Sequence, residues 1–389
     1  MHYTVVIAGG GPAGSAAAYT LARQGIQVCL IDKAIFPREK LCGGLLTLRS
    51  KKIFHEIFDA DWDKAYNFKT GGFHFLTRDG YLNGTEQYRD FYFTHRLSFD
   101  DYLLGLARDA GATIKEGEGL FSLSPEKNSC ALRSGEELTY DYLIGADGVN
   151  SVVAKTLFGE SFRKEKITFA LELDVDKVDV KRDVLYPEIY FDCMKWGYGW
   201  VFPKADSLTV GVGGLLRLNP DMKSDMARFC TEITGKAYPG KVKGHYIPGG
   251  DYRKKPGREN ILLAGDAAGF VEPVSGEGIA YAMQSGYLAA QAVFECIKTG
   301  NPKTALGIYR KKSRVITRDI QTAKLLRVLL FSPLLHKWFI RVLPKTHSLV
   351  HKHIELLSDE ISYTDYTRFI FYKAGEALFR KVFGKRKTA

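Results

Sequence analysis

The order of apolar and polar positions near the start of the chain indicates two buried strands joined by a helix. Residues 3–8 (YTVVIA) are apolar and rich in β-branched side chains, and residues 15–25 (SAAAYTLARQG) have the composition of a helix. A second apolar run follows at residues 26–32 (IQVCLID). Glycines separate the first run from the helix. This order of strand, glycine turn, helix and strand predicts the opening of a parallel α/β sheet.

Two later apolar runs share one character. Residues 142–146 (YLIGA) lead into residues 147–151 (DGVNS), and residues 261–264 (ILLA) lead into residues 265–269 (GDAAG). Each short strand therefore ends in a turn that holds glycine and aspartate. A stretch of small residues that begins near Gly276 predicts a helix after the second turn.

The segments between these runs are rich in strand patterns. Residues 71–92 and 160–245 predict a second sheet, with turns expected at Asp79-Gly80 and at Asn83-Gly84. In one strand Tyr198, Trp200 and Phe202 alternate with smaller residues. Because side chains of a strand alternate between the two faces of a sheet, the three rings are expected on one face. They form either sheet core or the wall of a pocket.

The last quarter of the chain reads as helical and apolar. Residues 325–343 hold 13 apolar side chains in 19 positions, but Arg327, Pro333, His336, Lys337 and Arg341 interrupt the run. These interruptions exclude a clean transmembrane helix. Two interpretations remain for residues 325–389: a basic amphipathic helix pair that touches a membrane surface, or helices that cap a substrate tunnel with their charged face in water.

Composition narrows the class of protein. The chain has 389 residues, of which 45% are hydrophobic and 25% charged, so it is expected to fold as a globular protein with more than one domain. Its six cysteines form no CxxC pair, so we expect neither a metal site nor a disulfide framework. The N-terminal run lacks the features of a signal peptide, which predicts a cytoplasmic protein.

The net charge of +11 is unevenly distributed. Residues 301–389 hold 19 Lys and Arg against 6 Asp and Glu, whereas residues 1–300 are close to neutral. A diffuse nucleic-acid-binding surface is therefore not expected, and the excess charge indicates local attraction to phosphate or anionic lipid.

The first glycine turn carries candidate chemistry. In the segment from Gly9 to Gly14 (GGGPAG), Gly9 permits a tight turn, Gly11 lacks the Cβ that would block a pyrophosphate, and Gly14 allows close packing of helix on strand. The helix start then offers free N–H groups to a phosphate. Asp32, at the end of the second strand, is placed to accept hydrogen bonds from a ribose. The turn predicts a dinucleotide site.

Together with residues 142–151 and 261–279, this turn resembles the three fingerprints of the FAD-dependent oxidoreductases of the p-hydroxybenzoate hydroxylase superfamily. The resemblance implies that Asp266 binds a ribityl hydroxyl and that the helix near Gly276 directs N–H groups at the flavin or at phosphate. The cofactor-binding residues that it implies are Gly9, Gly11, Ala13, Gly14, Asp32, Lys33, Arg96, Asp147, Gly148, Gly265, Asp266, Pro273, Gly276, Gly278 and Ile279.

Two further segments resemble a narrower group. The segment from Phe36 to Gly44 (FPREKLCGG) and the segment from Trp196 to Pro203 (WGYGWVFP) are similar to motifs of the geranylgeranyl reductase family. This resemblance implies a catalytic loop of Cys42, Gly43 and Gly44, in which Cys42 either donates a proton or only shapes the pocket. It also implies that Tyr198, Trp200 and Phe202 contact the substrate.

The same resemblance implies a fold and a reaction. The fold is a Rossmann-type FAD-binding domain (residues 1–65, 96–158 and 246–300) with an inserted antiparallel-sheet substrate domain (residues 66–95 and 159–245) and a basic helical region at residues 301–389. The reaction is reduction of a carbon–carbon double bond in an isoprenoid or isoprenoid-tailed lipid, pigment or quinone by reduced FAD. NAD(P)H is the expected transient donor, because the chain has no second GxGxxG turn.

Other classes stay open at this stage. The same fold hosts FAD-dependent monooxygenases that hydroxylate aromatic or apolar substrates, and this is the main alternative. A flavin-dependent halogenase and a flavoprotein that only binds lipid are weaker alternatives. Where the superfamily commonly has arginine after Ser151-Val152-Val153, this chain has Ala154-Lys155, so the nicotinamide contact is not assigned.

Overall fold

A computed structural model describes residues 1–180, 182–238 and 241–383. In this part of the chain the largest sheet has eight strands, and β1 (His2–Ala8) lies at its centre with parallel neighbours on both sides. The order along the sheet is β17 (Gly257–Arg258), β18 (Ile261–Leu263), β11 (Glu137–Gly145), β1, β2 (Val28–Asp32) and β8 (Thr113–Glu116). β9 (Leu120–Ser124) and β10 (Ser129–Leu132) extend it from β11.

Helices with small residues at their contacts cover this first sheet. α1 (Pro12–Ala22) packs between the sheet and α6 (Ile279–Thr299). A Cβ at Gly14 would overlap the carbonyl oxygen of Gly9, and one at Gly286 would overlap that of Ala13. These glycines therefore set the close approach of α1 to β1 and of α6 to α1. The other helices of this part are α2 (Leu48–Ile57), α3 (Arg96–Asp109), α4 (Val152–Phe158) and α7 (Ala305–Lys312).

The second sheet has seven strands among the described residues, and its neighbours are antiparallel except for β13 and β5. Its order is β16 (Lys243–Ile247), β12 (Thr168–Asp176), β15 (Ser207–Leu215), β14 (Tyr198–Pro203), β13 (Glu188–Tyr190), β5 (Phe73–Thr77) and β6 (Gly80–Thr85). One face packs on α5 (Met222–Thr234). Beside it, β3 (Leu45–Leu46), β7 (Phe91–Phe93) and β4 (Phe68–Thr70) form a small third sheet.

One of the two expected turns in this region is wrong. Asp79 and Gly80 do lie where β5 turns into β6, but Asn83 and Gly84 lie inside β6. The Asn83 side chain is buried and donates to the Leu343 carbonyl oxygen at 2.7 Å, so tertiary contact replaces the local turn. A Cβ at Gly84 would meet the His74 ring at 2.6 Å, which explains the glycine without a turn.

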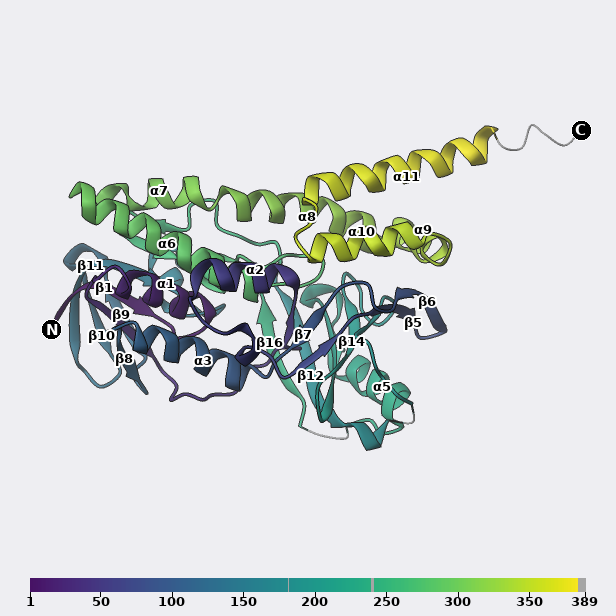
Figure 1. The fold of residues 1–389 in the computed structure, drawn as a ribbon, viewed down its shortest axis with the longest axis horizontal. Helices are drawn as coiled ribbons and strands as arrows, with labels where there is room; N and C mark the ends of the chain where they lie inside the picture. Colours follow the sequence, from purple (N-terminus) through teal and green to yellow (C-terminus); the bar gives the residue numbers. More distant parts are fainter. Residues whose placement is uncertain (181, 239–240, 384–389) are drawn as a thin grey trace, which may run out of the picture.

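The C-terminal helices lie over the second sheet as a separate layer (Figure 1). They are α8 (Arg314–Phe331), α9 (Pro333–Val342), α10 (His347–Leu357) and α11 (Tyr363–Phe383). Buried residues on α8 recur at helical spacing (Ile316, Ile320, Ala323, Leu326 and Leu330), which gives one face to the core. Pro333 begins α9 after the break at Ser332. No helix in the described ranges is both long and apolar enough to cross a bilayer.

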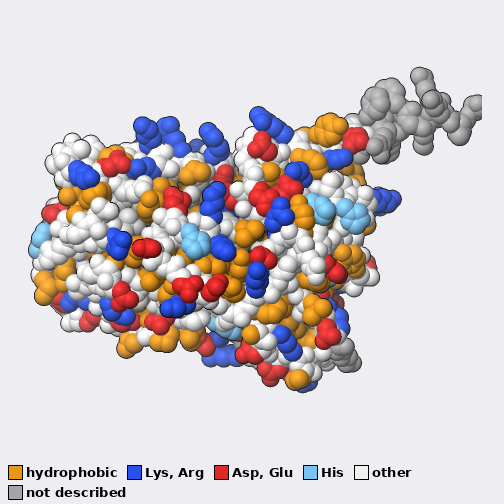
Figure 2. All heavy atoms as spheres, viewed as in Figure 1, with side chains coloured by type: hydrophobic (Ala, Val, Ile, Leu, Met, Phe, Trp, Pro, Cys, Tyr) orange, Lys and Arg blue, Asp and Glu red, His pale blue; other side chains and the backbone are white. Residues whose placement is uncertain are grey.

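Basic side chains line the outer edge of the helical layer. In Figure 2 Lys and Arg side chains stand along the upper edge, over α7 and α8. The exposed basic residues of these two helices are Arg310, Lys311, Arg314, Arg318 and Lys324.

We propose the division into domains that the sequence predicts. The second sheet ends at Ile247, two residues beyond the expected boundary at residue 245.

Candidate functional site

A cavity of about 680 Å³ lies between the first sheet, the second sheet and the C-terminal helices. Residues that are far apart in the sequence line it, including Gly11, Cys42, Asp266 and His353. Of the expected cofactor-binding residues, those that line the cavity are Gly11, Ala13, Lys33, Arg96, Asp147, Gly148, Gly265, Asp266, Pro273, Gly276, Gly278 and Ile279. Gly9, Gly14 and Asp32 are outside this lining.

The turn before α1 faces the cavity with backbone. A Cβ at Gly11 would meet only Arg38 Nη2, at 3.6 Å, so the space over this residue is open. Within the described residues α1 has no side-chain cap and no acidic residue in its first turn. Its N–H groups are therefore free to meet an anion in the cavity.

Asp32 is bound to the same turn. Its Oδ2 accepts from the Gly10 N–H at 2.7 Å, and its Oδ1 accepts from the Ala34 N–H at 2.8 Å. These bonds fix the carboxylate at the end of β2, below the glycine turn. Each carboxylate oxygen has a second lone pair for a hydroxyl.

The start of α6 faces the cavity from the other side. Gly276 has a φ of +74°, and Gly278 precedes the first helical residue, Ile279. In the described part of the chain α6 has neither a side-chain cap nor an acidic residue in its first turn. Asp266 lies beside it, with one oxygen 3.7 Å from Lys40 Nζ. Lys40, which belongs to the segment from Phe36 to Gly44, lines the cavity too, although it is not among the expected site residues.

Asp147 is a helix cap as well as a lining residue. Its carboxylate accepts from the Ser151 hydroxyl at 2.5 Å and from the Val152 N–H at 2.7 Å, at the start of α4. Burial raises the pKa of this carboxyl, and these hydrogen bonds act in the opposite direction. Gly148 next to it has a φ of +79° with open space where a Cβ would stand. The backbone of this pair therefore borders the cavity, while the Asp147 side chain organises the turn.

The loop that holds Cys42 packs against the aromatic strand. A Cβ at Gly43 would meet the Phe202 ring at 2.8 Å, and a Cβ at Gly44, whose φ is +76°, would overlap the Thr94 carbonyl oxygen. These two glycines are thus required by contacts within the protein. Cys42 Sγ accepts from the Gly44 N–H at 3.4 Å.

Arg96 lies beside this loop as part of a buried ion pair. It is 6% exposed and binds both oxygens of Asp100, at 2.6 and 2.7 Å. Burial lowers the pKa of Arg96, but Asp100 and, to a smaller extent, Cys42 act in the opposite direction and raise it overall. Arg38 Nη2 reaches the same carboxylate at 3.1 Å. Asp100 therefore holds two cations at the edge of the cavity.

Tyr198, Trp200 and Phe202 line the cavity from β14, as the alternation predicts. Successive ring centroids are 5.9 and 6.3 Å apart. The Tyr198 hydroxyl donates to the Ser275 carbonyl oxygen, which joins this wall to the loop before α6. Burial raises the pKa of Tyr198, so the phenol stays neutral.

The C-terminal helices complete the cavity. Their lining residues are Arg327, Leu330, Phe331, Phe339, Leu343, Leu349, Val350, His353, Leu357 and Tyr366. Arg327 donates to the Gly249 carbonyl oxygen and to Thr168 Oγ1, both at 3.2 Å, and so ties α8 to the second sheet. Burial lowers the pKa of His353 to about 4, so this ring is neutral. Parts of α8, α9, α10 and α11 therefore cover the cavity, as one of the two interpretations of the tail expects.

Two buried polar side chains, one in the cavity lining and one in contact with it, were not predicted from the sequence. Glu172 on β12 lines the cavity at 7% exposure, and Arg49 on α2 binds Glu277 in the loop before α6. An acidic residue within an apolar strand, in the segment LELDV, was the available signal for Glu172. The sequence does not say which face of β12 borders a cavity. The presence of an acidic residue in this strand was therefore not enough to place Glu172 at a site.

Comparison with known proteins shows which family the chain belongs to. A model of the FAD binding domain matches residues 2–190. A chloroplastic geranylgeranyl diphosphate reductase of Nicotiana tabacum is 32% identical over 318 residues, which cover 76% of this chain and 67% of the relative. A menaquinone reductase of Mycobacterium tuberculosis is 30% identical over 319 residues, which cover 74% and 75%. The chain belongs to the geranylgeranyl reductase family of FAD-dependent oxidoreductases.

Solved structures share the fold of this family member. A geranylgeranyl bacteriochlorophyll reductase-like protein from Thermoplasma acidophilum superposes with a TM-score of 0.77 at 22% identity, over 95% of this chain and 98% of that one. A flavin-dependent brominase superposes with a TM-score of 0.72 at 20% identity, over 97% and 100%. These likenesses concern the fold alone. They confirm the expected FAD-binding fold with C-terminal helices.

The residues of the cavity fit FAD. The uncapped starts of α1 and α6 face the same space among the described residues, and each brings N–H groups suited to phosphate or to a flavin carbonyl. Gly11 and Gly148 leave backbone exposed where larger residues would fill the space. Asp266 lines the same cavity, and Asp32 accepts from the Gly10 N–H of the glycine turn. This family member is an FAD-dependent oxidoreductase.

Proposed function

We propose that this protein reduces carbon–carbon double bonds of an isoprenoid, or of a lipid, pigment or quinone with an isoprenoid tail. The observation that carries the proposal is one continuous cavity, with a glycine cradle on one side and an apolar wall on the other. The wall combines the rings of β14 with apolar residues of α8, α9 and α10. Such a surface suits a flexible hydrocarbon chain. Relatives that are named for geranylgeranyl diphosphate and menaquinone support the same class of substrate.

We propose a role for each group of residues around the cavity. When bound, reduced FAD supplies the hydride, and NAD(P)H is the proposed donor that reduces it. The backbone of Gly11, Gly148 and Gly278 would hold the dinucleotide and the flavin. Tyr198, Trp200 and Phe202 would position the alkene and exclude water. The loop of Cys42, Gly43 and Gly44 would fix the distance between the two by its contact with Phe202.

Monooxygenation is the alternative. The fold does not separate the two reactions, because a flavin-dependent brominase has it as well. Anaerobic photometry separates them. We expect NADPH to bleach the flavin of the purified holoprotein and geranylgeranyl diphosphate or menaquinone to restore its colour without oxygen. Colour that returns only with oxygen, with a product that gains an oxygen atom, would overturn the reductase proposal.

We also propose that the protein is cytoplasmic and touches a membrane through residues 325–389. Within the described ranges no residue of α9 is buried. Leu334 is 85% exposed and Trp338 39%, and Lys337 lies beside them on the same helix. Phe339 of α9 faces the cavity. The helix thus separates the cavity from the outside with apolar groups on both sides, an arrangement suited to the surface of an anionic bilayer.

A further inference from the structure

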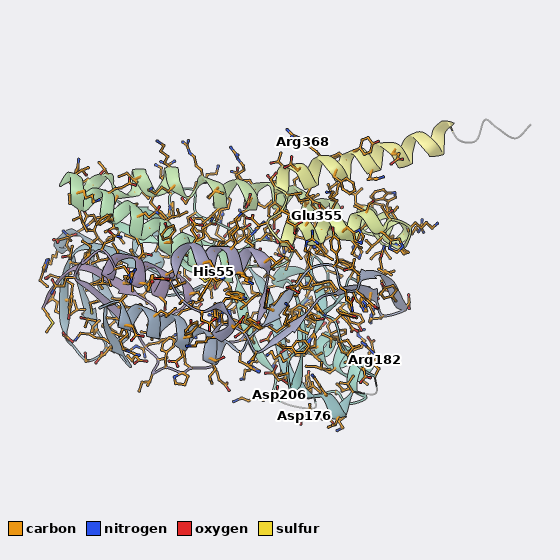
Figure 3. The ribbon with its side chains drawn as sticks, viewed as in Figure 1. His55, Asp176, Arg182, Asp206, Glu355 and Arg368 are labelled. Carbon is orange, nitrogen blue, oxygen red and sulfur yellow. The ribbon has the colours of Figure 1, made fainter. Side chains whose placement is uncertain are left out.

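The inner face of β12 carries a line of side chains from the cavity to solvent. Thr168, Ala170 and Glu172 occupy alternate positions and line the cavity. Asp174 and Asp176 continue the same face and are exposed. Asp176 lies at the edge of the molecule remote from the helical layer (Figure 3). Glu172 is therefore the innermost acid of a strand that reaches water at its other end.

One oxygen of the Glu172 carboxyl has no hydrogen-bond partner among the described residues, although the Cys42 backbone donates to this carboxyl. The unpaired oxygen, Oε2, is buried. The Trp200 Nε1, on the aromatic wall, is also buried without a hydrogen bond to any described residue. The two residues lie close together, because Glu172 pairs with Gly211 across the sheet and a Cβ at Gly211 would overlap the Trp200 indole. A buried carboxylate with one unpaired oxygen is costly unless it is protonated or used.

Charged and polar groups from four segments surround the Glu172 carboxyl. Lys204 follows β14, Lys243 lies opposite on β16, Asp174 is on the same strand, and the backbone of Cys42 comes from the catalytic loop. Burial outweighs these cations and raises the pKa of Glu172 to about 7. Lys204 Nζ contacts Asp174 Oδ1 at 3.1 Å, and the Asp174 side chain is 54% exposed. This pair offers a path for protons from water to the buried acid.

Cys42 is the main alternative proton donor, because its Sγ accepts from the Gly44 N–H at 3.4 Å and lies beside the Arg96 guanidinium. The other two candidates are less suited. The Tyr198 hydroxyl donates to a backbone oxygen, and burial raises its pKa. His353 is neutral because burial lowers its pKa to about 4.

We propose that the Glu172 carboxylic acid donates the proton that completes alkene reduction. This inference rests on the proposed function. The π electron pair of the double bond takes the Glu172 proton and forms one C–H bond. The hydride supplied in the proposed reduction forms the second C–H bond, at the other carbon. The carboxylate that remains is reprotonated from water along Asp174 and Lys204. Two C–H bonds form, one C–C π bond breaks, and no further oxidant or reductant is needed.

The test compares the variants Glu172→Gln and Glu172→Asp with a matched control. Asp176→Asn changes an acid on the same strand and face, but at its exposed end. We expect Glu172→Gln to slow anaerobic alkene-dependent flavin reoxidation by about 10²- to 10⁴-fold. Reduction by NADPH and equilibrium binding of geranylgeranyl diphosphate to the resting protein should change little. Glu172→Asp should restore part of the rate, and Asp176→Asn should keep all of it.

A second readout does not depend on turnover. The infrared carbonyl band of a protonated carboxylic acid should be present in the wild-type holoprotein below pH 7, should weaken above it, and should be missing in Glu172→Gln. A full rate of alkene reduction in a folded Glu172→Gln variant, or the same infrared band in that variant, would overturn the inference. Wild-type protein that binds the isoprenoid but never reduces it would instead overturn the proposed function.

Discussion

At the scale of single residues, Glu172 makes the stability of the protein depend on pH. Burial raises its folded pKa to about 7, above an ordinary value of 4.5. The folded state therefore holds the proton more tightly, and the free energy of unfolding falls as pH rises through this window. The loss amounts to about 3 kcal/mol between pH 4.5 and 7.

We expect chemical denaturation to show this loss in the wild type and not in Glu172→Gln. The difference in unfolding free energy between the two proteins should be constant below the window, should change within it, and should be constant again above it. Parallel pH profiles for both proteins would contradict an elevated pKa at Glu172.

Two helical glycines differ in the space that is available for a Cβ atom. A Cβ at Gly14 would overlap the Gly9 carbonyl oxygen, whereas a Cβ at Gly105 on α3 meets nothing within 4 Å. We expect Gly14→Ala to lower the free energy of unfolding by about 3 kcal/mol and to weaken FAD binding. Gly105→Ala should raise it by about 0.5–1 kcal/mol because alanine favours the helix. Thermal melts and flavin fluorescence measure both, and equal effects would contradict the packing described for α1.

At the scale of elements, a buried ion pair joins the loop before α6 to the C-terminal helices. Arg49 of α2 is 3% exposed, lies 3.4 Å from Glu277 and donates to the Leu356 carbonyl oxygen of α10 at 3.1 Å. It also donates to the Tyr281 hydroxyl of α6. The cation therefore connects α2 with the loop before α6, with α6 and with α10.

Removing this cation should loosen those segments. We expect Arg49→Met to lower the free energy of unfolding by about 3–5 kcal/mol, since Glu277 would stay buried without its partner. Adding Glu277→Gln should recover part of that loss. Lys52→Met on the same helix is the matched control, because Lys52 is 67% exposed and its pair with Asp359 contributes at most about 1 kcal/mol. Additive losses for Arg49→Met and Glu277→Gln would show that the pair is not coupled.

The elements that the sequence predicted best were those with local signals. Residues 3–8, 26–32 and 261–264 became strands of the first sheet because apolar runs beside glycine turns depend little on distant contacts. Asn83 and Gly84 were assigned wrongly, since a carbonyl 260 positions away satisfies the asparagine. Arg49 and Glu172 were missed for a related reason: burial and partners of a charged side chain arise only when distant segments pack together.

At the scale of the whole molecule, the helical layer carries exposed basic side chains together with exposed apolar side chains such as Leu334 and Trp338. We expect the purified protein to float with vesicles that contain anionic lipid, and less so at high salt. The double variant Leu334→Glu, Trp338→Glu should float less. Val178→Glu, at a 92% exposed apolar residue of the second sheet region, is the control that should not. Equal flotation of all three proteins would contradict a role of α9 at the membrane.

The central claim is that the cavity serves the addition of hydrogen to an isoprenoid double bond. Mass spectrometry tests it most directly. Holoprotein and NADPH are incubated without oxygen with geranylgeranyl diphosphate or with menaquinone. The masses of the products are then measured. We expect at least one substrate to gain two hydrogen atoms for each double bond reduced. Substrates that stay unchanged, or that gain an oxygen atom once air is admitted, would contradict it.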